Sequence, residues 1–251
     1  MQLEPHKRNW EELAEVDPLW AILSNASLQH GRWDINDFFS TGEREISTMM
    51  ETVKRLHFHV NPDSVLDFGC GVGRLTRAFS SRFQTCYGVD ISERMIENAQ
   101  RLNHEFPNCH FCLNTVDNLR IFPNDSFDMI YTNLVLQHIP HREIIKSYIK
   151  DFVRTLKPDG LLVFQLPSHI PLRRRAQLRR RLYTALRFAG FSHTMLYNKF
   201  GLNPMKMSYI SAEDVKATIG GAGGQVDFVE TRQTPQYLSS TYFVTRQHHN
   251  S

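Results

Sequence analysis

The sequence predicts a doubly wound α/β fold, in which a sheet of seven strands has helices on both faces. Two observations support this. From residue 64 onward, short apolar runs bounded by turn-forming residues alternate with segments of helical period. A turn with three alternate glycines directly follows the first apolar run. The length of 251 residues and the 41% hydrophobic content allow a substantial buried core.

The first elements follow from apolar patterning. Residues 64–68 form a short apolar run after the turn formers Asn61-Pro-Asp63, which is typical of a buried parallel strand. A helix is expected over 74–83, with an apolar face of Leu75, Ala78, Phe79 and Phe83. Residues 85–90 read as a second strand that ends on an acidic residue.

The alternation then continues along the chain. Ser92 is a suitable N-cap for a helix that turns Met95, Ile96, Ala99 and Leu102 inward. Residues 109–114 and 127–132 are the third and fourth expected strands, the latter after the turn Pro123-Asn-Asp-Ser.

A helix over 142–156 follows, and Lys157-Pro-Asp-Gly160 stops it before a fifth strand at 161–166. Ser211 caps a helix through 219, a glycine-rich turn covers 220–224, and the last strands are expected at 226–230 and 241–245.

Two stretches fall outside the alternation. We expect residues 1–55 to form an N-terminal helical cap and residues 56–251 to form the main domain, with 168–208 inserted after the fifth strand as a helical lid. Both stretches mix aromatic and polar residues at irregular spacing, so they resemble neither repeats nor low-complexity linkers.

Positive charge is concentrated in the second stretch. Residues 160–212 hold nine Arg and Lys but no Asp or Glu, so the remainder carries −6 within a total of +3. In the arginine-rich helix 172–188, an apolar face of Leu178, Leu182, Ala185, Leu186 and Ala189 lies opposite most arginines. This predicts a lid with a solvated arginine face, or a contact with an anionic small substrate or carrier, RNA phosphates or an anionic membrane. A single basic cluster makes nucleic acid the less favoured partner.

Compartment and metal content follow from what the sequence lacks. The basic start has no apolar run behind it, and no apolar span reaches the ~20 residues of a membrane helix, so we expect a soluble, cytoplasmic protein. The four cysteines lack the spacing of a disulfide framework, so reduced thiols are expected. Cys109-His-Phe-Cys112 is half a zinc motif without a second half nearby, and we expect no metal.

The glycine turn indicates a ligand. Gly69, Gly71 and Gly73 lie where a ligand approaches the main chain at the carboxyl end of the first strand. Asp90 ends the second strand, seventeen residues after Gly73, where a carboxylate accepts the hydroxyls of a ribose. On these residues alone, NAD and S-adenosylmethionine fit equally well.

Four blocks between residues 60 and 167 then separate the two cofactors. They are Val65-Leu-Asp-Phe-Gly-Cys-Gly-Val-Gly-Arg-Leu-Thr76, Tyr87-Gly-Val-Asp-Ile-Ser92 with Met95, Phe127-Asp-Met-Ile-Tyr-Thr-Asn-Leu-Val-Leu-Gln-His-Ile-Pro140 and Leu156-Lys-Pro-Asp-Gly-Leu-Leu-Val163. Together they resemble a class I S-adenosylmethionine-dependent methyltransferase with its Rossmann-like fold. The resemblance implies a mostly parallel sheet whose last strand is antiparallel.

The resemblance also implies a cofactor site. Asp67 and the turn Gly69-Cys70-Gly71-Val72-Gly73-Arg74 would meet the methionine part, Asp90 the ribose, and Ile91 or Met95 the adenine. The adenine amino group would meet one of Thr115, Val116 and Asp117, with Asn133 and Leu134 beside the sulfonium. From the N-terminal stretch, Phe38, Phe39, Thr41 and Gly42 would either line the site or pack a cap against the sheet.

Methyl transfer requires alignment and water exclusion more than strong catalytic groups. If the acceptor needs a general base, His138 is the first candidate and His141 the second, although a histidine that opens a helix also serves as a cap. The chain lacks the Asn/Asp-Pro-Pro-aromatic run of methylases that act on the amino groups of adenine or cytosine, which argues against that chemistry. No cysteine follows the fourth strand, so a cysteine nucleophile for methylation at pyrimidine C5 is not expected.

We therefore predict methyl transfer to an O, N or C atom of a small organic metabolite, including an anionic one, in biosynthesis. The alternatives are an RNA methyltransferase that docks through 172–188, a non-catalytic S-adenosylmethionine-binding module, and, least favoured, a nicotinamide-dependent dehydrogenase. The sequence does not indicate an oligomeric state.

Overall fold

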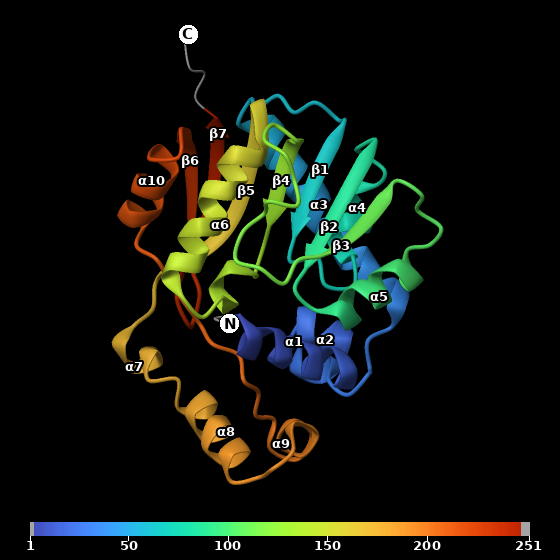
Figure 1. Cartoon of the computed structure of the whole chain (residues 1–251), viewed down its shortest axis with the longest axis vertical. Coiled ribbons are helices and arrows are strands. Elements are labelled where there is room, and N and C mark those ends of the chain that lie inside the picture. The colour runs from blue at the N-terminus through green and yellow to red at the C-terminus, as the bar shows by residue number, and fades with distance from the viewer. Residues whose placement is uncertain (1–2, 247–251) are drawn as a thin grey trace.

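A seven-stranded sheet forms the centre of the computed structural model, which describes residues 3–246 (Figure 1). Its strands lie in the order β3-β2-β1-β4-β5-β7-β6. β7 pairs antiparallel with β5 and β6, and the other neighbouring pairs are parallel. The strands are β1 Ser64–Phe68, β2 Thr85–Asp90, β3 Cys109–Leu113, β4 Phe127–Thr132, β5 Leu156–His169, β6 Gly224–Gln233 and β7 Leu238–Arg246. The doubly wound fold and the antiparallel last strand are thus confirmed.

Helices pack on both faces of the sheet because buried strands alternate their side chains between two cores. Val65 of β1 joins the core under α3 and α4, and the next residue, Leu66, joins the core under α6 and α10. The helices are α1 Glu4–Val16, α2 Pro18–Ile22, η1 Ala26–Leu28, α3 Ile35–Arg55, α4 Arg74–Phe79, α5 Glu93–Leu102, η2 Leu136–His138, α6 Arg142–Thr155, α7 Leu172–Arg175, α8 Leu178–Phe188, α9 His193–Phe200 and α10 Ala212–Gly220.

The predicted helix caps form as expected. The hydroxyl of Ser92 accepts a hydrogen bond from the backbone N–H of Met95, and the hydroxyl of Ser211 accepts one from the backbone N–H of Asp214. Each cap satisfies a backbone donor that would otherwise be unpaired in the first turn.

Element boundaries differ from expectation where strand pairing competes with helical periodicity. α6 ends at Thr155, and β5 begins at the next residue because Leu156 pairs with Phe127. At its other end β5 extends to His169, since β7 continues as its partner. α4 is shorter than predicted and ends at Phe79.

The N-terminal stretch has two roles in the structure. α3 packs against α4 and contributes Ile46, Met49 and Val53 to the core on that face of the sheet. α1 and α2 instead lie across the end of the sheet where β1 and β4 finish (Figure 1). The division at residue 55 into a cap and a main domain stays a prediction.

The inserted stretch after β5 extends away from the sheet, with α8 and α9 side by side below it (Figure 1). The faces of α8 differ from expectation. Leu178 and Leu182 are exposed, whereas Tyr183 is buried against Leu196 and Leu202. Of the leucines on the expected apolar face, only Leu186 packs toward α9, beside the buried ring of Tyr183.

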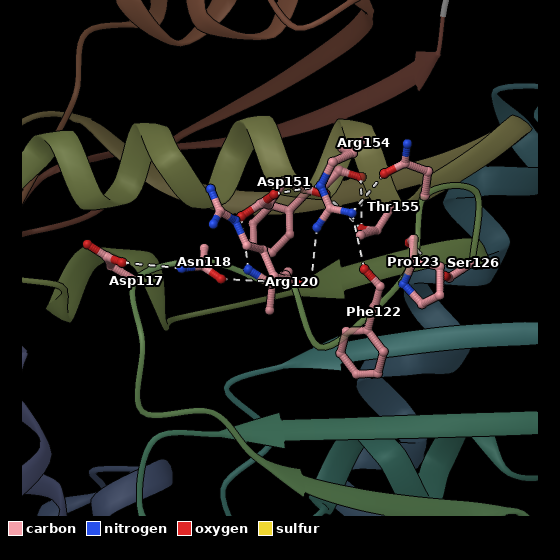
Figure 2. A network of polar contacts seen from close by, with 12 residues as sticks. Asp117, Asn118, Arg120, Phe122, Pro123, Ser126, Asp151, Arg154 and Thr155 are labelled. Atoms are coloured by element: carbon pink, nitrogen blue, oxygen red, sulfur yellow. Dashed lines mark hydrogen bonds and ion pairs between the residues drawn. The ribbon is translucent and has the colours of Figure 1, made fainter.

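A polar network fixes the long connection between β3 and β4 (Figure 2). Arg154 of α6 donates to the backbone oxygens of Leu119 and Phe122 and to the carboxylate of Asp151. Asp151 also accepts from the backbone N–H of Leu119 at 2.9 Å. The network holds the loop beyond β3 against α6, and so fixes the residues that enter the site from this loop.

Candidate functional site

A cavity of about 410 Å³ lies at the carboxyl ends of β1, β2, β3 and β4, where doubly wound sheets bind ligands. Its floor is formed by the turns that follow these strands, and α1, α2 and the stretch after α9 cover it. The predicted site residues that line it are Gly69, Gly71, Arg74, Asp90, Ile91, Met95, Asn133, Leu134 and His138.

The glycine turn after β1 adopts backbone conformations that side chains disfavour. Gly69 and Gly71 have φ values of +77° and +54°. A Cβ atom on Gly69 would lie 2.4 Å from the side chain of Val135, and one on Gly71 would lie 2.5 Å from Ile22. The glycines therefore serve the fold as well as the cavity, because the loop after β4 and helix α2 both approach the bare main chain.

Asp90 holds this turn and faces the cavity. One carboxylate oxygen accepts from the backbone N–H of Gly71 and the other from Ser92, both at 2.9 Å. Burial raises the pKa of Asp90, and these backbone donors oppose the shift. Each oxygen can accept a further hydrogen bond, so the carboxylate remains able to bind a pair of hydroxyls.

Asn114 lines the cavity and was not among the predicted site residues. Its backbone N–H donates to Asp90 O, and its side-chain amide donates to Asn118 O. Its amide oxygen is buried without a hydrogen-bond partner among the described residues. Thr115, Val116 and Asp117, the candidates from the sequence, are exposed and do not line the cavity. The expected stretch is thus present at the site, but the residue that reaches the cavity is the one directly after β3.

Arg74 lines the cavity with its charge already paired. The guanidinium donates to Glu45 at 2.7 Å and to the hydroxyl of Thr41 at 3.3 Å. Glu45 also accepts from Tyr131 and from the amide of Asn133. Glu45 was not a sequence candidate, although it lies one helical turn after Gly42, which was.

Other candidates support the site from outside the cavity lining. Asp67 is buried and accepts from the hydroxyl of Thr76 at 2.7 Å, and burial raises its pKa to about 7. Phe38 and Phe39 pack with Val72 and Met95 in a small core. Gly42 lets α3 approach the backbone of α4, and Cys70 and Gly73 shape the turn.

The two histidine candidates occupy different environments. His138 lines the cavity, its Nδ1 lies 3.1 Å from Lys206 O, and its Nε2 lies 3.2 Å from the Gln137 amide nitrogen. A carbonyl at Nδ1 assigns the proton to that nitrogen and leaves a lone pair on Nε2. Burial lowers the pKa of His138 to about 4, so the ring is neutral at pH 7. His141 is exposed at the start of α6 and does not line the cavity.

A second histidine lines the cavity from α1. We refer to α1, α2 and the stretch after α9 together as the cover. His6 of α1 accepts from the indole N–H of Trp10, whose ring meets His138 edge to face at 5.9 Å. Burial, followed by the nearby His138, lowers the pKa of His6 to about 4. The residues that the cover and other elements add to the lining, none of them predicted, include His6, Trp10, Trp20, Tyr148, Met205, Met207 and Tyr237. Their positions depend on long-range packing, and no local motif marks them.

The residues of the cavity fit a nucleoside. Asp90 provides a carboxylate for ribose hydroxyls, and the unpartnered oxygen of Asn114 provides an acceptor for an amino group. Ile91 and Met95 provide apolar contacts for a flat ring. Asn133 and Leu134 directly follow β4 and also line the cavity.

Comparison with known proteins finds methyltransferases. A family model described as "Methyltransferase domain" matches residues 65–160. The chain is 33% identical over 124 residues to an uncharacterized methyltransferase, YcgJ, of Bacillus subtilis, and 35% identical over 107 residues to a demethylmenaquinone methyltransferase of Tropheryma whipplei. These matches cover 49% and 43% of this chain, and 46% and 43% of the relatives. The chain thus spans less than half the length of these curated relatives.

The structural comparison extends over nearly the whole chain. Magnesium protoporphyrin IX methyltransferase from Synechocystis PCC 6803, solved with bound S-adenosylhomocysteine, superimposes with a TM-score of 0.62 at 18% identity. The superposition covers 98% of this chain and 100% of that one. The chain therefore has the Rossmann-like fold of class I methyltransferases, and its residues 65–160 are similar to a methyltransferase domain.

Proposed function

We propose that this chain transfers a methyl group from S-adenosylmethionine to an O, N or C atom of a small organic metabolite. The observation that carries this proposal is that one cavity is lined by Asp90, Asn114 and the glycine turn, which lie at the ends of β2, β3 and β1, and also by His138, which follows the next strand of the sheet, β4. The arrangement joins groups suited to a nucleoside with a group suited to proton transfer.

The chain's own residues would hold the cofactor and exclude water. Asp90, Asn114, the glycine turn, Ile91 and Met95 would bind it, and Asn133 and Leu134 would face its reactive end. When bound, S-adenosylmethionine supplies an electrophilic methyl group on a sulfonium. Trp10 and Trp20 from the cover add aromatic surface to the lining, which excludes water and favours a cation.

His138 is the proposed proton acceptor when the methyl acceptor carries an acidic proton. The ring is neutral, and its Nε2 lone pair meets only the Gln137 amide among the described residues. Burial reduces the basicity of the imidazole, so we propose assistance to an acceptor of low pKa, such as a phenolic or enolic hydroxyl. The position of His138 in the lining also favours turnover over a non-catalytic binding module.

The lining favours an uncharged acceptor over an anionic one. Among the lining residues that the structure describes, Arg74 is paired with Glu45, and both histidines are neutral. An anion would therefore find no unpaired cation there, whereas tryptophan and methionine side chains offer apolar contact. We place the protein in the cytoplasm, and no helix among residues 3–246 is long and apolar enough to span a membrane.

Calorimetric titration with S-adenosylmethionine and S-adenosylhomocysteine tests the cofactor site. Asp90→Asn should weaken binding by about 1.5–3 kcal/mol, since a charged hydrogen bond is lost. Asp37→Asn changes an exposed carboxylate on α3 and serves as the matched control. Equal affinities in the two variants would exclude Asp90 from cofactor binding.

Transfer of a labelled methyl group tests the activity. The panel of acceptors should include phenols, enols, carboxylic acids and amines, together with RNA. His138→Gln should slow transfer to a hydroxyl acceptor by about 10²-fold or more while cofactor affinity stays the same. Full activity in this variant would remove His138 as the base, and transfer to RNA alone would replace the proposed substrate class.

A further inference from the structure

The inserted stretch presents a surface that is both basic and apolar. Exposed apolar side chains project from α7, α8 and α9, and Leu178 is 72% exposed, Leu182 52% and Phe188 97%. We call this set the basic apolar surface. Its members are Leu172, Leu178, Leu182, Phe188 and Phe200, with Arg173, Arg174, Arg175, Arg179, Arg181 and Lys199. A soluble surface rarely gathers this many large apolar side chains without a partner.

The opposite face of α8 is already engaged, which fixes the orientation of the helix. Arg187 donates to Glu12 of α1 at 2.8 Å, and the Tyr183 hydroxyl lies 2.9 Å from Nδ1 of His193. Leu186 packs with Tyr183 against α9. Leu178, Leu182 and Phe188 therefore point away from the body of the protein, and their exposure follows from the packing of the other face.

The charge of the surface selects its partner. Residues 160–212 contain no Asp or Glu, and Arg173, Arg174 and Arg181 make no ion pair that the structure describes. A symmetric contact with a second copy would bring two such surfaces together and oppose like charges. The partner must accept apolar side chains and supply negative charge.

We propose that the basic apolar surface docks on the surface of an anionic phospholipid bilayer. Leucine and phenylalanine enter the boundary between headgroups and acyl chains, while arginines beside them pair with phosphate groups. Nucleic acid would pair with the arginines, but it provides no apolar environment for the three leucines among the five exposed apolar side chains of this surface. An anionic bilayer provides phosphates for the arginines and an apolar layer for the leucine and phenylalanine side chains.

The position of the surface connects it with the cavity. Asn203, Met205 and Met207 follow α9 directly and line the cavity from the cover. Docking through α8 and α9 therefore holds one end of that covering stretch at the lipid surface. The proposal concerns binding alone, so it stands or fails independently of methyl transfer.

Co-sedimentation with lipid vesicles tests the proposal on the full chain. One set of vesicles contains phosphatidylcholine alone, and the other contains phosphatidylcholine mixed with phosphatidylglycerol. We expect binding to the mixed vesicles, weak binding to the neutral ones, and a loss of affinity as salt rises. No binding to the mixed vesicles at low salt, or equal binding to both sets, would overturn the proposal.

The charged part is tested by the triple variant Arg173→Gln, Arg174→Gln, Arg181→Gln. Each arginine near an anionic surface contributes about fivefold in affinity, so the variant should bind about 10²-fold more weakly. The matched control is Lys54→Gln, Arg55→Gln, Lys150→Gln, which removes the same charge from exposed positions on α3 and α6. Equal losses in the two variants would reduce the effect to net charge and contradict a docking surface.

The apolar part is tested by Phe188→Ser and Leu178→Ser. Both side chains are exposed, so the folded state loses little packing. We expect about tenfold weaker binding to the mixed vesicles in each variant. Ile121→Ser, which changes an apolar residue 48% exposed in the loop before β4, is the control and should bind as the unaltered chain does. Unchanged binding in Phe188→Ser and Leu178→Ser would overturn the insertion of these side chains.

Two further measurements exclude other partners. Titration with single-stranded RNA at the same salt should give weaker binding than the mixed vesicles, and tighter binding to RNA would replace the bilayer with nucleic acid. Light scattering of the protein alone should show no self-association that Phe188→Ser abolishes. An assembly that this variant dissolves would assign the surface to a second copy instead.

Discussion

Helices α6 and α8 are both amphipathic in sequence, yet only α6 buries its apolar face. In α6, Ile145, Ile149 and Phe152 are fully buried against the sheet. In α8, Leu178, Leu182 and Phe188 stand in solvent, and the packed face is built around Tyr183. A helical period of apolar residues thus shows that a face needs an apolar partner, without showing whether this partner belongs to the same chain.

The arginines of the two helices differ in the same way. Arg154 of α6 binds backbone oxygens of the loop after β3 and the carboxylate of Asp151 (Figure 2). Arg181 of α8 is exposed and has no side-chain hydrogen bond that the structure describes. From the sequence pattern alone, Arg154 and Arg181 would both be expected to be solvated charges on the polar side of a helix.

Truncation of the two apolar faces gives the largest expected contrast. Ile149→Ala should lower the free energy of unfolding by about 2–5 kcal/mol, because it removes fully buried methyl groups and leaves a cavity. Leu182→Ala should change it by less than about 0.5 kcal/mol, since the side chain is half exposed. Urea denaturation of both variants measures the difference, and similar losses would mean that α8 buries its leucines in solution.

Replacement of the arginines is expected to give the next largest effect. Arg154→Ala should cost about 1.5–3 kcal/mol of unfolding free energy, because the carboxylate of Asp151 and two backbone oxygens lose a charged donor. Arg181→Ala is the matched control and should be neutral. Thermal or chemical denaturation measures both, and an equal cost would contradict the contrast between a bound and a solvated arginine.

Low pH is expected to reduce the stability contributed by His138 and His6, because burial lowers the pKa of both side chains. Burial lowers the pKa of His138 from 6.5 to about 4, so between these values the unfolded chain binds a proton that the folded chain does not. Stability from this group therefore falls as pH drops through that window, by about 2 kcal/mol at pH 5. His6 acts in the same direction, and Asp67, whose pKa burial raises to about 7, acts in the opposite one.

The comparison is therefore made between the unaltered chain and His138→Asn, in which Asp67 and His6 are retained. Between pH 7.5 and pH 5, the unaltered chain should lose about 2 kcal/mol more unfolding free energy than the variant. Parallel stability curves for the two proteins would show that His138 titrates normally and is not buried.

The smallest expected effect is at the contact that attaches α8 to the cover. The ion pair between Arg187 and Glu12 is partly exposed on both sides, so its coupling should be about 0.2–1 kcal/mol in a double-mutant cycle. A coupling of several kcal/mol would mean that α8 is fixed to α1 as firmly as α6 is fixed to the sheet.

The site was predictable where a backbone motif determines it. The glycine turn directly follows one strand that the sequence predicts, Asp90 is the last residue of the next, and both line the cavity. Asn114 was missed by one residue, because the exact end of β3 decides which side chain of the loop points inward. Glu45, Trp10 and Met205 come from distant segments, and their approach to the cavity depends on how α3, α1 and the stretch after α9 pack.

The sequence by itself determined the alternation of strands and helices, the doubly wound sheet, the methyltransferase-type fold and the end of the sheet at which the cavity lies, because period, turn formers and glycines act through local backbone geometry. Tertiary structure alone decided that Arg74 is paired with Glu45, that burial lowers the pKa of His138, and that Leu178 and Leu182 of α8 face outward. These outcomes depend on burial and on partners far away in the chain, which no local pattern specifies.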